Sequence, residues 1–255
     1  MSEEDKKRIP LTVSVVIPVY NECRSVEREA LKIHRFLERH FADSEILLVD
    51  DGSTDGSAAI LDRLASSLDG VRLLRHPVNQ GIGAAVMDGY RGASKEALTY
   101  FPADSQAEIE DIAEFASRMA EGVDVVLGFR SDRRDYSPVR LCYSYLNLLL
   151  HGLLFGRFYR DVNWIHLVRR DALRRISVRS RSAFMAGEML EKIRRTGGKI
   201  IEARSRYNPR REGRTNVGNF RGARAALADM LRLRWDLWVR PRSSLEAGIV
   251  KGERA

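Results

Sequence analysis

The sequence predicts a single α/β domain built on a mostly parallel β-sheet with helices on its faces. Up to about residue 128, short apolar runs alternate with amphipathic helical segments, which is typical of βαβ units. Several of these runs end in polar turn formers, as strands do at the ligand-binding edge of an open α/β sheet. The chain has 255 residues, 44% of them hydrophobic and 31% charged, so it can bury one core as a globular protein.

The predicted elements alternate regularly through the first half of the chain. Strands are expected at 13–19, 46–49, 71–75, 97–101 and 123–128. One helix is expected to follow the first strand and to end near residue 40, and a second is expected to begin near residue 55. Two more are expected over 82–92 and 108–121. Beyond Arg130 the alternation loosens, and helical spacing returns at 139–156 and 217–238.

The most informative segment directly follows the apolar run 46–49. Asp50 and Asp51 stand at the end of this predicted strand, where open α/β sheets place their ligands. Gly52 allows a tight turn, and Ser53 or Thr54 can cap the helix that follows. Taken alone, the segment favours the simpler alternative of an acidic turn that only caps a helix.

Three further landmarks follow in order, and together the four form a specific pattern. The segments are "SVVIPVYNE" at 14–22, "LLVDDGSTDGS" at 47–57, "NQGIGAA" at 79–85 and "ADSQ" at 103–106. This series resembles the nucleotide-binding half of the family-two glycosyltransferases of GT-A fold. The resemblance implies an enzyme, a hexosyltransferase, that takes its sugar from a nucleoside diphosphate.

The resemblance also implies which residues bind the donor. An aromatic ring offers a flat face to a nucleotide base, and a carboxylate accepts hydrogen bonds from a base or a ribose. The base and the ribose would be held by Pro18, Tyr20, Glu22 and one or both of Asp50 and Asp51, and the diphosphate side by Ala103, Asp104 and Gln106. The donor would be a GDP- or UDP-hexose, and these residues do not distinguish the two bases.

Asp104 is the predicted catalytic centre, with Mg²⁺ or Mn²⁺ as cofactor. Asp104 and Gln106 supply oxygen ligands that suit such an ion, which would neutralise the leaving diphosphate. Relatives with the fuller pattern carry an acidic residue two places before Asp104, where this chain has Pro102. The alternative for Asp104 is a cap of the helix near Ile109.

The second half of the chain is similar to the dolichyl-phosphate mannose synthases and their bacterial polyprenyl-phosphate relatives. Arg130 follows the predicted strand 123–128, where an arginine of the family reaches phosphate, and it is the second predicted catalytic residue. Arg140 and Ser144 share a helical face and match the residues that meet the acceptor phosphate. Arg210 and Arg214 match a basic loop that could close over a phosphate.

The expected division of the chain follows from these matches. Residues 12–215 form the glycosyltransferase domain, with a nucleotide-sugar half at 12–128 and an acceptor half at 129–215. Residues 1–11 are expected to be flexible, 216–240 to contain an amphipathic helix, and 241–255 to be disordered. Cys23 and Cys142 form no metal or redox spacing and are expected to be reduced.

Charge and apolar patterning bear on partners and location. The net charge of +8 favours anionic partners, and because no nucleic-acid motif is present, nucleic acid is not expected among them. The charged N-terminus lacks a signal-like apolar run, which favours the cytoplasm. The helices predicted at 139–156 and 216–240 combine apolar residues with arginines, so they favour peripheral contact with an anionic membrane or, equally, packing on the core.

The sequence therefore predicts transfer of a hexose from a nucleotide sugar to a polyprenyl phosphate, inverting and metal-dependent. A phosphate acceptor is already anionic and needs little help from a general base. Two alternatives stay open at this point. One is a soluble GT-A enzyme acting on a glycan or a small-molecule hydroxyl, and the other is a non-catalytic nucleotide-sugar-binding scaffold.

Overall fold

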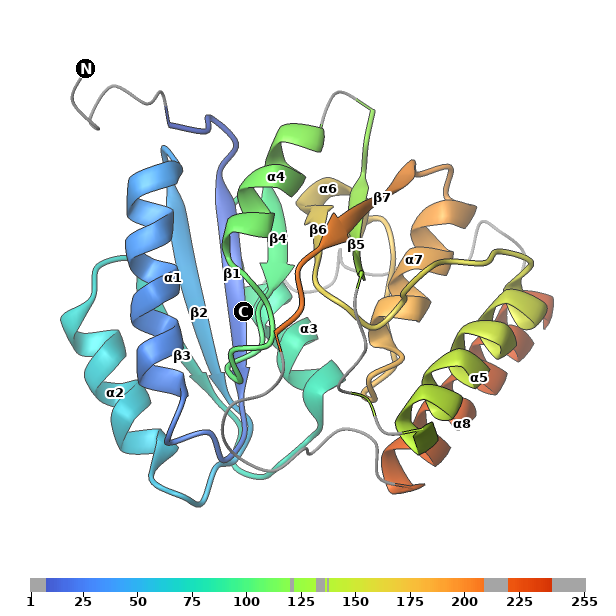
Figure 1. The fold of residues 1–255 in the computed structure, drawn as a ribbon, viewed down its shortest axis with the longest axis horizontal. Coiled ribbons are helices and arrows are strands. Elements are labelled where there is room, and N and C mark those ends of the chain that lie inside the picture. The colour runs from blue at the N-terminus through green and yellow to red at the C-terminus, as the bar shows by residue number, and fades with distance from the viewer. Residues whose placement is uncertain (1–7, 120–121, 132–135, 137, 209–219, 240–255) are drawn as a thin grey trace, which may run out of the picture.

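The fold is a seven-stranded sheet with helices on both faces (Figure 1). The computed structural model describes residues 8–119, 122–131, 136, 138–208 and 220–239, apart from the side chains of Arg140, Phe220 and Arg221. The strands are β1 (Val13–Val19), β2 (Ser44–Asp50), β3 (Val71–Arg75), β4 (Ala97–Tyr100), β5 (Val125–Arg130), β6 (His166–Arg169) and β7 (Ile200–Ser205). The helices are α1 (Val26–His40), α2 (Ser57–Ser67), α3 (Ile82–Gly92), α4 (Glu110–Arg118), α5 (Pro138–Phe155), α6 (Arg170–Arg174), α7 (Met185–Arg195) and α8 (Phe220–Val239).

The strands lie in the order β3-β2-β1-β4-β6-β5-β7, and only β6 runs against its neighbours. The predicted α/β class with a mostly parallel sheet is therefore confirmed. β1 pairs with β2 from Val13 opposite Ser44 to Val19 opposite Asp50, so the two strands end level with each other. We call the edge at which the parallel strands end the carboxyl edge, which is the lower edge in Figure 1.

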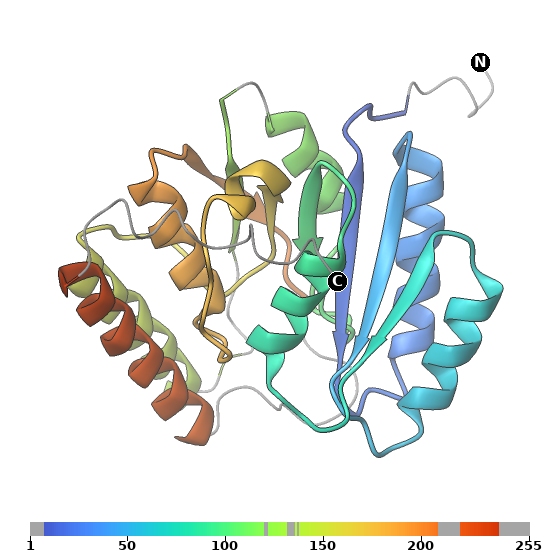
Figure 2. The same cartoon turned by 180° about the vertical axis from the view of Figure 1, so that it is seen from behind.

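Two apolar cores cover the two faces of the sheet, as expected when parallel strands are buried on both sides. Helices α1, α2 and α4 pack on one face, and α3, α6 and α7 pack on the other, which Figure 2 shows from behind. Helix α1 illustrates the cause, because Val26, Ala30, Ile33 and Leu37 recur on one face and are all buried.

Helices α5 and α8 lie side by side at the end of the molecule beyond β7 (Figures 1 and 2). A small third core joins them, in which Phe155 of α5 meets Met230 and Leu233 of α8 and Phe184 of the loop before α7. Their outer faces stay exposed. None of the helices in the described parts of the chain is long and apolar enough to cross a bilayer.

The first five predicted strands are present with small shifts at their ends. Helix α4 is shorter than the predicted 108–121, although residues 120 and 121 lie outside the described part. Strand β6, with four residues and antiparallel pairing, gives too short a pattern to stand out by periodicity. Cys23 and Cys142 are free, as predicted.

A buried histidine on β6 makes the stability of the fold depend on pH. Nδ1 of His166 lies 3.3 Å from the carbonyl oxygen of Trp164, and Nε2 lies 2.9 Å from the hydroxyl of Tyr90. A carbonyl only accepts, so Nδ1 carries the proton and Nε2 accepts from Tyr90. Burial lowers the pKa of His166 to about 4, which keeps the ring neutral.

We expect the free energy of unfolding to fall as the pH drops from about 6.5, the pKa of an unfolded histidine, toward about 4. In that window the unfolded chain binds a proton that the folded chain excludes, which costs up to ~1.4 kcal/mol per pH unit. Urea unfolding at pH 7 and pH 5, compared between the wild type and His166→Gln, measures this contribution. Equal pH slopes in the two proteins would contradict it.

Candidate functional site

Hydrogen bonds join the loops after β1 and β2 at the carboxyl edge. The Asn21 side-chain oxygen accepts a hydrogen bond from the Thr54 backbone N–H at 2.8 Å. In return, Ser53 Oγ accepts from the backbone N–H of Asn21 at 3.1 Å. Ser57 Oγ accepts from the backbone N–H of Glu22 at 3.0 Å. The predicted capping role of Ser53 and Thr54 is wrong, because their bonds hold the loop after β1, whereas α2 starts after Gly56.

Asp50 and Asp51 are buried and are tied into the protein. Asp50 accepts from the backbone N–H of Ser53 at 2.9 Å and from Nε of Arg75 at 3.3 Å. One oxygen of Asp51 lies 2.7 Å from His76 Nδ1 and 2.8 Å from the backbone nitrogen of Gln80. Its other oxygen accepts from the backbone of Gly81 at 2.9 Å. Asp51 thus connects the end of β2 to the glycine-rich entry of α3.

The glycines of that entry allow a close backbone contact with residues 181–182. A Cβ on Gly83 would lie 2.4 Å from the carbonyl oxygen of Ser182, and the Gly83 N–H donates to Arg181 at 3.0 Å. Gly81 has φ +95°, a conformation that favours glycine. Ser182 in turn donates from Oγ to Asp229 of α8 at 2.7 Å. The contacts of residues 181 and 182 therefore link the glycine-rich segment to α8.

The turn after β4 presents Asp104 at the same edge. Asp104 is half-buried, and one of its oxygens accepts from the Gln106 backbone N–H at 3.2 Å. Ser105 has φ +63° and donates to Glu29 of α1, which fixes the turn. Helix α4 has Ile109 at its N-cap, so the alternative of Asp104 as the cap of that helix is wrong.

The residue types of Asp104 and Gln106, a carboxylate and an amide, are compatible with a metal ion that would also bind a diphosphate. The described residues contain no group of three His, Cys, Asp or Glu side chains that could hold a metal ion. Mg²⁺ is commonly held by one or two carboxylates together with substrate phosphates, so a single carboxylate suits that type of site. The amide nitrogen of Gln106 donates to the Tyr207 hydroxyl at 3.0 Å, and of the two amide atoms only the oxygen can coordinate a cation.

Arg130, at the end of β5, is paired with a buried carboxylate. Its Nε and one terminal nitrogen bond the two oxygens of Asp161 at 2.6 and 3.0 Å, and the other terminal nitrogen bonds the Tyr136 hydroxyl. The guanidinium also lies 4.7 Å from the ring centre of Trp164. Burial alone would lower the pKa of Arg130, but the Asp161 carboxylate raises it above its ordinary value. The arginine is thus charged, and that charge is neutralised locally.

The groups predicted to be catalytic share one neighbourhood. Burial raises the pKa of the Tyr100 phenol well above its ordinary value; Arg130 opposes this shift, whereas Asp161 and Asp104 add to it. These three charges therefore lie close enough to Tyr100 to act on it electrostatically. Tyr20, 36% exposed, and half-buried Glu22 stand on the neighbouring loop after β1. The carboxyl edge thus gathers the residues predicted for the donor.

A cavity of about 530 Å³ opens beside Arg130, on the side toward α5. Its lining consists of Phe129, Arg130, Ser131, Tyr145, Arg160 and Arg204. The sequence did not predict a role for Arg160 or Arg204. In the sequence, Arg204 follows only the short apolar pair Ile200 and Ile201, and the structure shows it exposed on β7 between buried Ala203 and Ser205.

The structure describes only some of the residues predicted to bind the acceptor. Ser144 is half-buried on α5. Arg140 lies one turn earlier on that helix, and its side chain falls outside the described part of the protein. Arg210 and Arg214 lie outside the described residues. Their predicted contact with phosphate stays a prediction.

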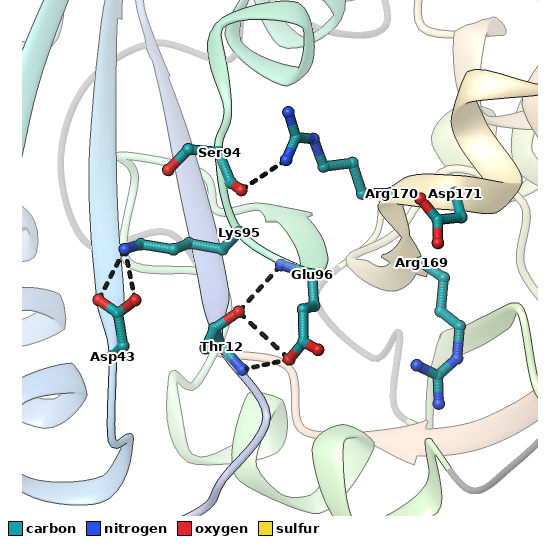
Figure 3. A pocket seen from close by; sticks show the side chains of 8 residues that line it. All are labelled: Thr12, Asp43, Ser94, Lys95, Glu96, Arg169, Arg170 and Asp171. Atoms are coloured by element: carbon teal, nitrogen blue, oxygen red, sulfur yellow. Dashed lines mark hydrogen bonds and ion pairs between the residues drawn. The ribbon is translucent and has the colours of Figure 1, made fainter.

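A second cavity, of about 300 Å³, lies at the opposite edge of the sheet, where β1, β2 and β4 begin (Figure 3). Lys95 binds both oxygens of Asp43 at 2.6 Å, Glu96 bonds Thr12, and Arg170 donates to the carbonyl oxygen of Ser94 at 2.6 Å. These groups satisfy one another within the lining. None of the residues predicted for the site lines this second cavity.

Comparison with known proteins decides the family. Residues 14–183 match the model of glycosyl transferase family 2, which is two thirds of the chain. The chain belongs to this family. The predicted resemblance is therefore confirmed.

The curated relatives are longer proteins. The glycosyltransferase AglD of Haloferax volcanii is 29% identical over 257 residues, which cover 94% of this chain and 40% of that protein. The undecaprenyl-phosphate 4-deoxy-4-formamido-L-arabinose transferase of Pseudomonas paraeruginosa is 40% identical over 128 residues, 48% of this chain and 37% of that protein. The family 2 chain thus spans about two fifths of the length of these relatives.

Solved structures share the fold. Glucosyl-3-phosphoglycerate synthase from Mycobacterium tuberculosis, in complex with Mn²⁺, UDP and phosphoglyceric acid, superposes with a TM-score of 0.69 at 19% identity. The match covers 88% of this chain and 78% of that one. The same enzyme with Mn²⁺ and UDP-glucose gives a TM-score of 0.69 at 18% identity. At this identity the likeness establishes the fold.

Proposed function

We propose that the protein transfers a hexose from a GDP- or UDP-sugar to a polyprenyl phosphate, with inversion and with Mg²⁺ or Mn²⁺. The observation that carries this proposal is the carboxyl edge, where Asp104 stands beside loops that are cross-braced by hydrogen bonds. Such preorganised groups at a sheet edge suit a nucleotide sugar, whose charge changes as its diphosphate leaves.

The residues divide into those that face the donor and those that hold the loops. Tyr20 and Glu22, with Pro18 behind them, would take the base and the ribose. Asp50 and Asp51 are buried at the end of the neighbouring strand, and Asp51 would act through the backbone of Gln80 and Gly81, because both its oxygens are paired within the protein. Ala103, Asp104 and Gln106 would form the diphosphate side of the site.

The reaction asks little of a general base. A phosphate acceptor is anionic near neutral pH, so its oxygen can attack the sugar carbon once it is positioned there. A bound Mg²⁺ or Mn²⁺ would neutralise the leaving diphosphate. Asp104 would hold that ion and orient the diphosphate, and Asp161 and Arg130 would shape the acceptor side.

A lipid acceptor is supported by two observations. The arabinose transferase relative is named for undecaprenyl phosphate. In this chain, helix α5 exposes a series of large apolar side chains next to the site: Val139, Tyr143, Tyr145, Leu146, Leu149 and Leu153. Apolar side chains clustered at an exposed surface commonly mark an interaction site.

A thermal-shift panel of GDP- and UDP-sugars, each with and without Mn²⁺, tests the donor half. A ligand at 100 times its Kd stabilises the native state by about 2.7 kcal/mol. In a chain of this size that raises Tm by roughly 5–10 °C. The proposal predicts a metal-linked shift with sugars of one base. No shift with any donor would instead favour a protein that has lost the donor site.

We further propose that the outer face of α5 and α8 rests on an anionic membrane surface. Trp235 and Trp238 of α8 are 61% and 70% exposed, and their rings contact each other at 5.3 Å between centroids. Exposed Arg224 and Arg234 lie on the same helix. Tryptophans with arginines suit the headgroup region of a bilayer, where rings insert and cations meet phosphates.

Replacing Trp235 and Trp238 by serine is expected to lower partitioning onto anionic vesicles by roughly 10- to 100-fold, because two large apolar groups no longer leave water. Co-sedimentation with phosphatidylglycerol vesicles measures this partitioning. Val78→Ser, which alters an exposed apolar residue away from the helix pair, is the control. Equal sedimentation of all three proteins would contradict contact through α8.

A further inference from the structure

We propose that Ser182 and Asp229 are positioning residues of the donor site, because together they hold the glycine-rich segment 79–85 from the side of α8. This inference rests on the proposed function, since it adds two residues to the same donor site. Neither residue belongs to the four sequence segments that predicted that site. Both act through the backbone that surrounds Asp51, which is one of the predicted donor-binding residues.

Residues 181 and 182 lie directly against the glycine-rich segment. The backbone N–H of Gly83 donates to the carbonyl oxygen of Arg181 at 3.0 Å. A Cβ on Gly83 would lie 2.4 Å from the carbonyl oxygen of Ser182, and a Cβ on Gly81 would lie 2.9 Å from that of residue 181. No side chain fits between the two backbones, so the position of Gly81 and Gly83 depends on where residues 181 and 182 are held.

The glycine-rich segment in turn determines the surroundings of Asp51. The backbone N–H groups of Gln80 and Gly81 donate to its two oxygens at 2.8 and 2.9 Å. Asp51 is buried, so the loss of these donors would leave its carboxylate without water to replace them. A shift of Gly81 would therefore displace Asp51 or weaken its hydrogen bonds at the end of β2, where the donor is proposed to bind.

Helix α8 holds residue 182 in place. Ser182 Oγ donates to a carboxylate oxygen of Asp229 at 2.7 Å, and the backbone N–H of Ser182 donates to the same oxygen at 3.4 Å. Arg232, one turn further along α8, pairs with Asp229 at 3.0 Å and donates to the hydroxyl of Ser180 at 3.2 Å. Hydrogen bonds to a charged acceptor are stronger than those between neutral groups. The position of residue 182 therefore depends on the carboxylate of Asp229.

A simpler alternative is that these contacts only hold α8 against the rest of the molecule. Asp236 distinguishes the two explanations. It is also a half-buried acid of α8, two turns after Asp229, and it pairs with Arg179 at 3.5 Å. In the described part of the chain, however, neither Asp236 nor Arg179 forms a hydrogen bond or an ion pair with the glycine-rich segment. Replacing Asp236 thus removes a contact of α8 and leaves those of the glycine-rich segment intact.

The test measures binding of UDP and of GDP, each with Mn²⁺, by titration calorimetry. Asp229→Ala and Ser182→Ala are each expected to weaken binding of the nucleotide that the wild type binds by ~10-fold, a size common for substitutions that act through intervening residues. Asp236→Ala should bind as the wild type does. The double variant Ser182→Ala/Asp229→Ala should bind no more weakly than either single variant, because both substitutions remove the same hydrogen bond.

Steady-state kinetics add a readout that a loss of stability alone would not move. Neither residue is placed at the reacting groups, so the KM for the donor should rise while kcat at saturating donor stays that of the wild type. The Tm of each unliganded variant shows whether it is folded. If Asp229→Ala does not fold, Ser182→Ala decides the question, since it removes only a hydroxyl.

Weaker nucleotide binding in Asp229→Ala and Ser182→Ala, but not in Asp236→Ala, supports the inference. Wild-type affinity in the first two variants would overturn it and leave the proposed function standing. Equal weakening in Asp229→Ala and Asp236→Ala would show that the contacts only hold α8 in place, and would overturn it as well. A wild type that binds neither nucleotide would overturn the donor site of the proposed function together with this inference.

Discussion

Replacing Asp104 by asparagine is expected to reduce sugar transfer by at least ~100-fold, through the loss of charge at the diphosphate. The substitution is conservative in shape. The side-chain oxygen of asparagine can still accept the bond from the Gln106 backbone that Asp104 now accepts at 3.2 Å. The turn after β4 should therefore survive, and the effect can be read as one on chemistry. Steady-state kcat/KM, with circular dichroism as a check on folding, measures it.

Asp43→Asn is the matched control for Asp104. It removes a carboxylate at the opposite edge of the sheet, where Asp43 pairs with Lys95. We expect its kcat/KM to equal that of the wild type. Near wild-type turnover in Asp104→Asn would remove Asp104 from the proposed metal and diphosphate site.

The second large effect concerns the Arg130–Asp161 pair. Asp161→Ala is expected to destabilise the protein by about 3–5 kcal/mol, because it leaves the buried guanidinium without its counter-charge. The side chains are only 10% and 3% exposed, so water cannot replace the lost partner. Tm should fall by roughly 10 °C in a chain of this size. Thermal and urea unfolding both measure this loss.

A double-mutant cycle tests the origin of that loss. Arg130→Met/Asp161→Leu replaces both charges by apolar groups and should be less destabilising than Asp161→Ala alone, since no charge is then left unpaired. The single variants of the cycle are Arg130→Met and Asp161→Leu. We expect their separate losses of stability to sum to more than the loss in the double variant. Strictly additive losses would mean that the contact seen between the two groups contributes nothing to folding.

The strands of the first half of the chain could be predicted from the sequence for a simple physical reason. The central parallel strands β1, β2 and β4 are buried on both faces, so they appear as apolar runs, and polar residues follow β1 and β2 directly at the carboxyl edge. Strand β6 has four residues and runs antiparallel, so it lacks that signature. Its place in the sheet is set by pairing with β4 and β5, which are distant in sequence.

The fold brings the predicted donor residues to one edge of the sheet, but the partners of those residues could not be predicted from the sequence. Asp104 and Gln106 share a turn, so their proximity follows from the sequence itself. Arg130 and Asp161 are 31 residues apart, and only the fold shows that the arginine is already paired. The pairing of Phe129 with Arg204 depends on the register of β5 against β7. Interactions of this kind cannot be read from spacing along the chain.

Following a labelled hexose from its nucleotide to a lipid tests the proposed transfer. The protein is incubated with labelled GDP- or UDP-hexose, polyprenyl phosphate and Mn²⁺, and the label is then extracted into organic solvent. We predict organic-soluble label that disappears with a chelator of divalent ions and with Asp104→Asn. Consumption of the donor with all label remaining in the aqueous phase would contradict a lipid phosphate as the acceptor.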